Sequence, residues 1–301
     1  MRLRLGSLHW SKLLTTSPKV CKNLDLSIYN RMVTNKALVD VICPFVGKRA
    51  LTIDISNCFH ITDEGFSALS SVCGAGVHAW KMKSVWDITA NAVLEMANNA
   101  KELEEIDLSN CRKVSDNLLA RIVGWVVTEP TAAQQQNAAR YKQQNITIPP
   151  VGTVVGCPKL KRLTLSYCKH VTDRSMAHLA VHAHQRLQSM DLTRCTTITD
   201  GGFQHWSIYK FAKLEKLILA DCTYLTDNAI VYLTNAAKGL KELDLVSPKS
   251  CIYISLLYCN NADTSPPVLL LCTLRHRHRS PLPRLSPTSL PQARLLRLRR
   301  L

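Results

Sequence analysis

The sequence predicts an α/β solenoid, because one segment returns at a fixed spacing along the chain. The segment reads LKRLTLSYCKHVTD at 160–173, LQSMDLTRCTTITD at 187–200 and LEKLILADCTYLTD at 214–227. In each copy a cysteine precedes an aspartate by five residues, and successive cysteines lie 27 residues apart. A strand-like L-x-x-L-x-L run followed by a cysteine at this period is typical of a leucine-rich-repeat solenoid, a curved horseshoe with parallel strands on the concave face and helices on the convex face.

Each repeat is expected to contain one strand and one helix. Leu163 and Leu165 alternate with polar residues, which is the period-two pattern of a half-buried strand. The spacing becomes helical after Thr172 and Asp173, where threonine suits the N-cap and aspartate suits the positive end of the helix dipole. The same Thr/Ser-Asp pair recurs at 62–63, 115–116, 199–200 and 226–227.

The regularly spaced cysteines are predicted to be structural. A cysteine at this place turns inward as a small apolar group with a weak S–H donor, so we interpret these residues as inert core rather than redox-active thiols. One repeat cannot bury enough surface to fold alone, and stacked repeats share one core. The structural positions are Cys58, Cys111, Cys168, Cys195 and Cys222.

The repeats cover 21–246, with about seven units and a partial eighth. Repeat one is degenerate, repeats two and four are clean, and repeat three places Trp80 and Met82 in the strand core and Val85 at the cysteine position. The eighth repeat opens correctly and then fails near Pro248. Residues 1–20 are read as a lead-in.

Two segments break the pattern. The segment 126–156 contains a Gln/Asn/Ala-rich run with little to bury, so it is predicted to be a disordered insert within the array. The tail 247–301 is basic and rich in proline and leucine, and we expect it to be disordered or non-native. The tail has nine Lys/Arg and one acid, so it holds half of the net charge of +16.

Composition excludes several classes of protein. Because the positive charge is concentrated in the tail, we do not expect nucleic acid as the partner, although the basic tail leaves that alternative and a nuclear signal open. No apolar run reaches the length of a membrane span, and no secretory signal precedes the cysteines. We therefore expect a reducing compartment, the cytoplasm and/or the nucleus, with a mitochondrial presequence as a minor alternative.

No enzymatic motif is recognisable. Nucleophile elbow, P-loop, HExxH and paired-carboxylate patterns are lacking, so we expect a non-enzyme that needs no cofactor. His178, His182 and His184 lie on one predicted helix, but no third metal ligand is predicted there. In the tail, Cys259, Cys272, His276 and His278 are zinc-compatible residue types whose spacing matches no finger, so no metal site is predicted.

The expected partner-binding residues lie on the concave face and its rim. The exposed mid-strand position is occupied by five aspartates in eight repeats, which favours recognition of a basic peptide; the alternative is that aspartate solvates the sheet and bonds neighbouring strands. Beyond the strands, aromatic and arginine residues form a mixed rim of the type used in binding hot spots. The candidate residues are Asp54, Lys81, Asp107, Arg162, Tyr167, Asp191, Arg194, Asp221 and Asp244.

The C-x-x-[ITVL]-[TS]-D motif on its 26–27-residue grid resembles that of the F-box/leucine-rich-repeat proteins, in their cysteine-containing subfamily. Similar arrays occur in fungal regulators of the Amn1/Grr1 kind. The resemblance implies the substrate-receptor part of an SCF-type ubiquitin ligase, or alternatively a free-standing adaptor or cell-cycle regulator that binds partners without ligase recruitment. An F-box would bind a Skp1-type adaptor upstream of the repeats; here residues 8–14 fit only the end of one, so the F-box is expected to be missing or truncated in this chain.

Overall fold

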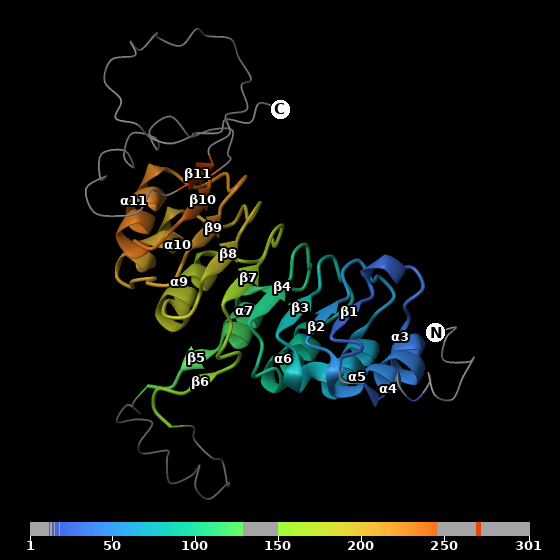
Figure 1. Cartoon of the computed structure of the whole chain (residues 1–301). Coiled ribbons are helices and arrows are strands. Elements are labelled where there is room, and N and C mark those ends of the chain that lie inside the picture. Colours follow the sequence, from blue (N-terminus) through green and yellow to red (C-terminus); the bar gives the residue numbers. More distant parts are fainter. Residues whose placement is uncertain are drawn as a thin grey trace, which may run out of the picture.

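The chain forms a leucine-rich-repeat solenoid, which confirms the predicted fold class. The computed structural model describes residues 12, 14, 16, 17, 19–128, 150–245 and 269–271. Consecutive strands lie side by side along one face of the array, and the helices lie along the other (Figure 1). The parallel sheet contains, in spatial order, β1 (Asn23–Asp25), β2 (Thr52–Asp54), β3 (Ala79–Lys81), β4 (Glu105–Asp107), β7 (Arg162–Thr164), β8 (Ser189–Asp191), β9 (Lys216–Ile218), β10 (Glu242–Asp244) and β11 (Leu269–Leu271).

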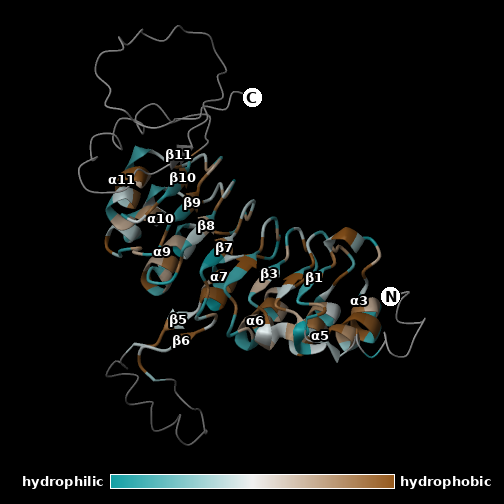
Figure 2. Cartoon of the chain, viewed as in Figure 1, coloured by the Kyte–Doolittle hydropathy of each residue, from teal (hydrophilic) through white to brown (hydrophobic). Residues whose placement is uncertain are grey.

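The strands are paired in one constant register, so equivalent side chains form straight rows across the sheet. Leu163, for example, lies opposite Ile106 on one side and Met190 on the other, and all three are buried. In β1–β4 and β7–β10 the first and third residues lie on the opposite face of the sheet from this core because side chains alternate along a strand, and of these residues only Ala79 is buried. In Figure 2, apolar and polar segments alternate along the whole described array, as expected for one core shared by all repeats.

The helices begin where the sequence predicts. Threonine or serine occupies the N-cap, and in five of the helices the first helical residue is the expected aspartate. Repeat one departs from this pattern, because its helical segment is divided into a short α-helix, a π-helical turn and a second short α-helix. The α- and π-helical segments are α3 (Asn35–Ala37), η2 (Leu38–Ile42), α4 (Cys43–Val46), α5 (Asp63–Cys73), α6 (Ala90–Asn99), α7 (Asp116–Val123), α9 (Asp173–Ala183), α10 (Asp200–Gln204) and α11 (Asp227–Ala236). The 3₁₀ turns are η1 (Ser27–Tyr29), η3 (Gly47–Arg49), η4 (Gly74–Gly76) and η5 (His205–Ser207).

The repeat cysteines form a hydrogen-bonded column inside the core. All five are buried and unbridged, and each thiol lies close to a backbone carbonyl of the preceding repeat. Cys195 Sγ, for instance, donates to Leu165 O at 3.1 Å, and Cys111 Sγ donates to Met82 O at 3.0 Å. Burial raises the pKa of Cys111 to about 12, so the thiol remains protonated and can donate at neutral pH.

In four repeats the aspartate at the helix start binds the next repeat. The Asp173 carboxylate accepts the backbone N–H of Thr199 at 2.7 Å and its hydroxyl at 2.6 Å. Asp63, Asp116 and Asp200 hold the N-cap threonine of the following repeat in the same way. From the sequence these carboxylates were expected only to interact with the helix dipole, because a bond between repeats is not visible in one repeat.

The predicted insert begins and ends in a pair of short strands. β5 (Trp125–Val126) pairs antiparallel with β6 (Val154–Val155), and residues 129–149 between them lie outside the described residues. Gly124, next to this strand pair, must be a glycine, because a Cβ there would lie 1.6 Å from Val155 O and its φ is 76°. The sheet continues undisturbed past the insert, since β4 pairs directly with β7.

The predicted disordered or non-native tail lies outside the described residues except for β11, which pairs in parallel with β10. The lead-in at 1–20 is described only in part.

Candidate functional site

Two adjacent surfaces contain the candidate residues. The first, called the sheet face, consists of the first and third residues of β1–β4 and β7–β10. The second, called the rim, consists of the five-residue loops that follow the strands of repeats two to seven. The rim loops are 56–60, 83–87, 109–113, 166–170, 193–197 and 220–224.

The sheet-face aspartates bond to their own turns. Asp191 Oδ1 accepts the backbone N–H of Thr193 at 2.8 Å and its hydroxyl at 2.6 Å. Asp54 accepts the N–H of Ser56 at 2.9 Å, and Asp107 accepts both donors of Ser109. Neither alternative from the sequence describes this arrangement, in which the carboxylate closes the turn two residues later. The spacing D-x-[ST] was the available signal.

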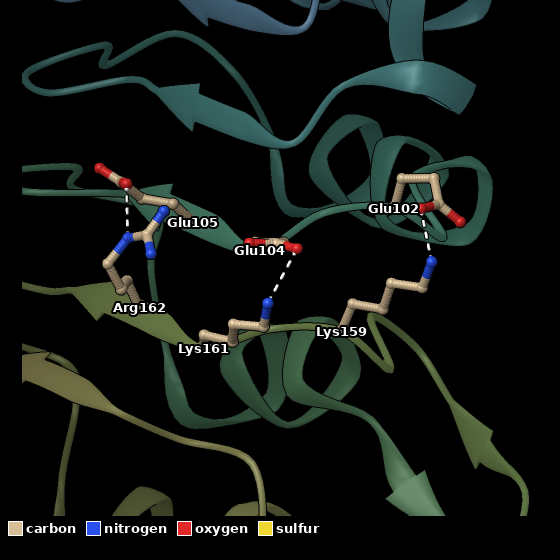
Figure 3. A network of polar contacts seen from close by, with 6 residues as sticks. All are labelled: Glu102, Glu104, Glu105, Lys159, Lys161 and Arg162. Atoms are coloured by element: carbon tan, nitrogen blue, oxygen red, sulfur yellow. Dashed lines mark hydrogen bonds and ion pairs between the residues drawn. The ribbon is translucent and has the colours of Figure 1, made fainter. Parts of the chain in front are cut away.

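Charge pairs cross the sheet face where the insert interrupts the sequence. Figure 3 shows three carboxylates on or just before β4 facing three cations on or just before β7. The pairs are Glu102–Lys159 (2.5 Å), Glu104–Lys161 (2.9 Å) and Glu105–Arg162 (2.7 Å). The hydrogen bond from Lys161 lowers the pKa of Glu104. Each pair is partly exposed, so it contributes at most about 1 kcal/mol, but together they favour the β4–β7 register.

The sheet face is acidic, and most of its charged side chains already form hydrogen bonds or ion pairs within the chain. Its sixteen positions hold seven carboxylates and three cations, a net charge of −4. Two of the cations, Arg162 and Lys216, are paired with Glu105 and Glu242 respectively. Lys81 is the third and is exposed.

The rim has the opposite charge. Its five cations outnumber its two carboxylates, so its net charge is +3 with His60 and His170 neutral. Of the cations, Arg194 is paired with Asp221 at 2.8 Å. The other four form no ion pair with any described residue, and all four are exposed: Lys83, Arg112, Lys113 and Lys169.

The rim loops have a fixed backbone. In repeats two to seven the residue before the cysteine position has a φ between 56° and 64°, a left-handed conformation uncommon for residues other than glycine. In repeats two to six its N–H is bonded to the next repeat, as in Tyr167 N–H to Thr193 O at 2.8 Å. The six positions form one row along the rim, in which Ser84 is buried, Asn57, Asn110 and Asp221 are partly buried, and Tyr167 and Arg194 are exposed.

Aromatic rings in the rim contact side chains of the neighbouring loops. The Trp86 ring lies 5.0 Å from the Phe59 ring, and the Arg112 guanidinium lies 4.3 Å from the Trp86 centroid. Trp86 Nε1 donates to Asn110 O at 3.2 Å. Arg194 lies over the Tyr167 ring at 5.2 Å. These contacts join the loops of repeats two to four and of repeats five to seven into two rigid groups.

The structure divides the nine candidate residues between the two surfaces. Tyr167, Arg194 and Asp221 form one contact chain on the rim. On the sheet face lie Asp54, Lys81, Asp107, Arg162, Asp191 and Asp244. Trp86 was not among the candidates, because only its position after the third-repeat Val85 indicated that it belongs to the rim.

The helical histidines hold the insert base instead of forming a metal pair. His178 Nε2 lies 2.8 Å from Gly124 O, and His182 Nδ1 accepts the Val126 N–H at 3.3 Å. Burial lowers the pKa of both histidines. Within the described ranges, no cluster of three metal-ligating side chains occurs, and no helix is long and apolar enough to cross a bilayer.

No protein-family model and no curated protein matches the chain. Among solved structures, the chain is similar to a chain in the crystal structure of the Rad7 and Elc1 complex in yeast, at 13% sequence identity and a TM-score of 0.40. The match covers 80% of this chain and 65% of the other chain. The chain is also similar to the TLR13–ssRNA13 complex, at 13% identity and a TM-score of 0.37, covering 85% and 32%. The chain thus spans less than two thirds of the length of either neighbour.

Proposed function

We propose that this chain is a non-catalytic protein-recognition module. The observation that supports it is the rim, in which one residue of each loop has the same left-handed backbone conformation in six successive repeats and exposed arginine and aromatic side chains lie beside the sheet face. Such a surface is preorganised, so a partner would meet little ordering cost on the protein side. Its arginine and aromatic side chains are those that binding hot spots use.

The finer proposal is that the module is the substrate receptor of an SCF-type ubiquitin ligase in the cytoplasm and/or nucleus. It is supported by the cysteine-containing repeat motif and by the column that the cysteines form. The second candidate is a free-standing adaptor or regulator that binds proteins without recruiting a ligase. Neither role requires a cofactor, a membrane or a catalytic residue in this chain.

The test is direct binding between the purified chain, extended to include any upstream F-box, and a purified Skp1-type adaptor. The receptor role predicts a stable complex on size-exclusion chromatography and adaptor-dependent ubiquitin transfer to a captured partner. Partner binding without adaptor binding would favour the free-standing adaptor. Failure to bind any protein partner would reject the recognition proposal itself.

A further inference from the structure

We propose that the rim of repeats four and five binds a carboxylate-rich peptide segment, with the basic flank of the same peptide lying over the sheet face. This inference rests on the recognition function proposed above and names the chemistry of the partner. The binding residues are Arg112 and Lys113 of repeat four, Lys169 of repeat five and Tyr167 beside them.

The rim contains cations that form no ion pair within the described residues. Arg112, Lys113 and Lys169 are exposed and form no ion pair there, whereas the sheet-face carboxylates already accept bonds from their own turns or from cations. An acidic ligand therefore gains new charge pairs on the rim without breaking internal ones. On the sheet face, the net charge of −4 attracts the basic flank of the peptide while the carboxylates keep the hydrogen bonds that they already accept.

The spacing of the rim cations also fits an extended peptide. Neighbouring parallel strands lie about 4.8 Å apart, so cations on successive rim loops are separated by roughly that distance. An extended peptide advances about 3.3 Å per residue. An extended segment with acidic side chains at consecutive or alternate residues can thus contact Arg112, Lys113 and Lys169 while crossing only two repeats.

The aromatic side chains of the rim and the charge of the sheet face favour a peptide over a nucleic acid. Single-stranded nucleic acids bind by stacking bases on free aromatic faces. Here Trp86 is already in contact with Phe59 and Arg112, and the Arg194 guanidinium lies over one face of the half-exposed Tyr167 ring. A phosphate backbone would also run beside the sheet face, whose net charge is −4. A peptide with an acidic stretch followed by basic residues complements both surfaces.

The test uses fluorescein-labelled twelve-residue peptides and the full-length chain in fluorescence anisotropy at physiological salt. One peptide has a block of glutamates followed by a block of lysines, and the other has the same composition in alternating order. The test variant is Arg112→Glu/Lys113→Glu/Lys169→Glu. The matched control is Lys210→Glu/Lys213→Glu/Lys238→Glu, which makes the same charge change at exposed residues away from the rim. The basic tail is identical in all proteins, so the differences report the rim.

We expect the block peptide to bind more tightly than the alternating one, and the rim variant to lose about tenfold or more in affinity while the control changes about twofold or less. Equal losses in both variants would overturn the inference, as would tighter binding of an oligouridine of twelve nucleotides that depends on the same rim residues. If only a lysine-rich peptide binds, and Asp107→Asn/Asp191→Asn abolishes that binding, the inference fails while protein recognition stands, with the sheet face as its site. If no peptide binds, the inference also fails, and adaptor and partner binding then decide the proposed function separately.

Discussion

Replacing Asp173 by alanine should uncouple repeat five from repeat six. The Asp173 carboxylate receives two hydrogen bonds from Thr199, at 2.7 and 2.6 Å, and the whole contact is partly buried. The chain contains its own control for this change. Asp227 occupies the same position in repeat seven, but its Oδ1 is buried and has no partner among the described residues.

The magnitude follows from the number and type of bonds lost. A hydrogen bond to a charged group contributes about 1.5–3 kcal/mol, and the two share one carboxylate, so we expect Asp173→Ala to lower the free energy of unfolding by about 2–4 kcal/mol. Asp173→Asn should cost less, because Asn35 already makes the equivalent pair with Thr62 through its amide, with Nδ2 donating to the hydroxyl at 2.7 Å. Asp227→Ala should change stability by less than about 1 kcal/mol, since only the helix-dipole interaction is lost.

The assay is urea unfolding of the three variants followed by circular dichroism at 222 nm. The expected order of destabilisation is Asp173→Ala, then Asp173→Asn, then Asp227→Ala. If Asp227→Ala costs as much as Asp173→Ala, the carboxylates act on their own helices and the coupling between repeats is refuted.

Three further outcomes are expected. Asp116 is desolvated, which raises its pKa, but hydrogen bonds from Ser175 and Thr172 outweigh this effect and hold the pKa below its ordinary value. The stabilising contribution of the Asp116 carboxylate should therefore be complete above about pH 4 and be lost as pH falls through the native pKa. The difference in urea midpoint between the natural chain and Asp116→Ala should accordingly narrow on acidification. Burial raises the pKa of Cys168 to about 11 and that of Cys111 to about 12, so iodoacetamide at pH 8 should label Cys21 well before either residue in peptide-resolved mass spectrometry, and equal rates would contradict the buried column. Burial lowers the pKa of His182, whose neutral Nδ1 accepts the Val126 N–H, so this bond should be intact above about pH 6.5 and be lost as pH falls through the native pKa of His182. The Val126 amide should then exchange its hydrogen faster than the intrinsic rate change predicts, and His182→Leu should abolish this extra pH dependence.

The candidate site was only partly predictable from the sequence. Tyr167, Arg194 and Asp221 were expected at a binding rim, and they do form one contact chain there. The sheet-face aspartates were expected either to recognise a basic peptide or to solvate the sheet and bond neighbouring strands, and in the structure Asp54, Asp107 and Asp191 accept hydrogen bonds from their own turns. Whether any of these residues binds a partner stays a prediction.

The sequence alone determined the repeat length, the strand and helix in each repeat, the helix starts at Asp63 and Asp173, and the inward thiols. These features follow from side-chain periodicity and N-cap chemistry, which act within one repeat. The tertiary structure decided which groups meet across repeats: the Asp173–Thr199 bonds, the opposite charges of rim and sheet face, and the histidines beneath the insert base. Those contacts join residues about 26 to 56 positions apart, and only the register of stacked repeats brings such distant side chains within bonding distance.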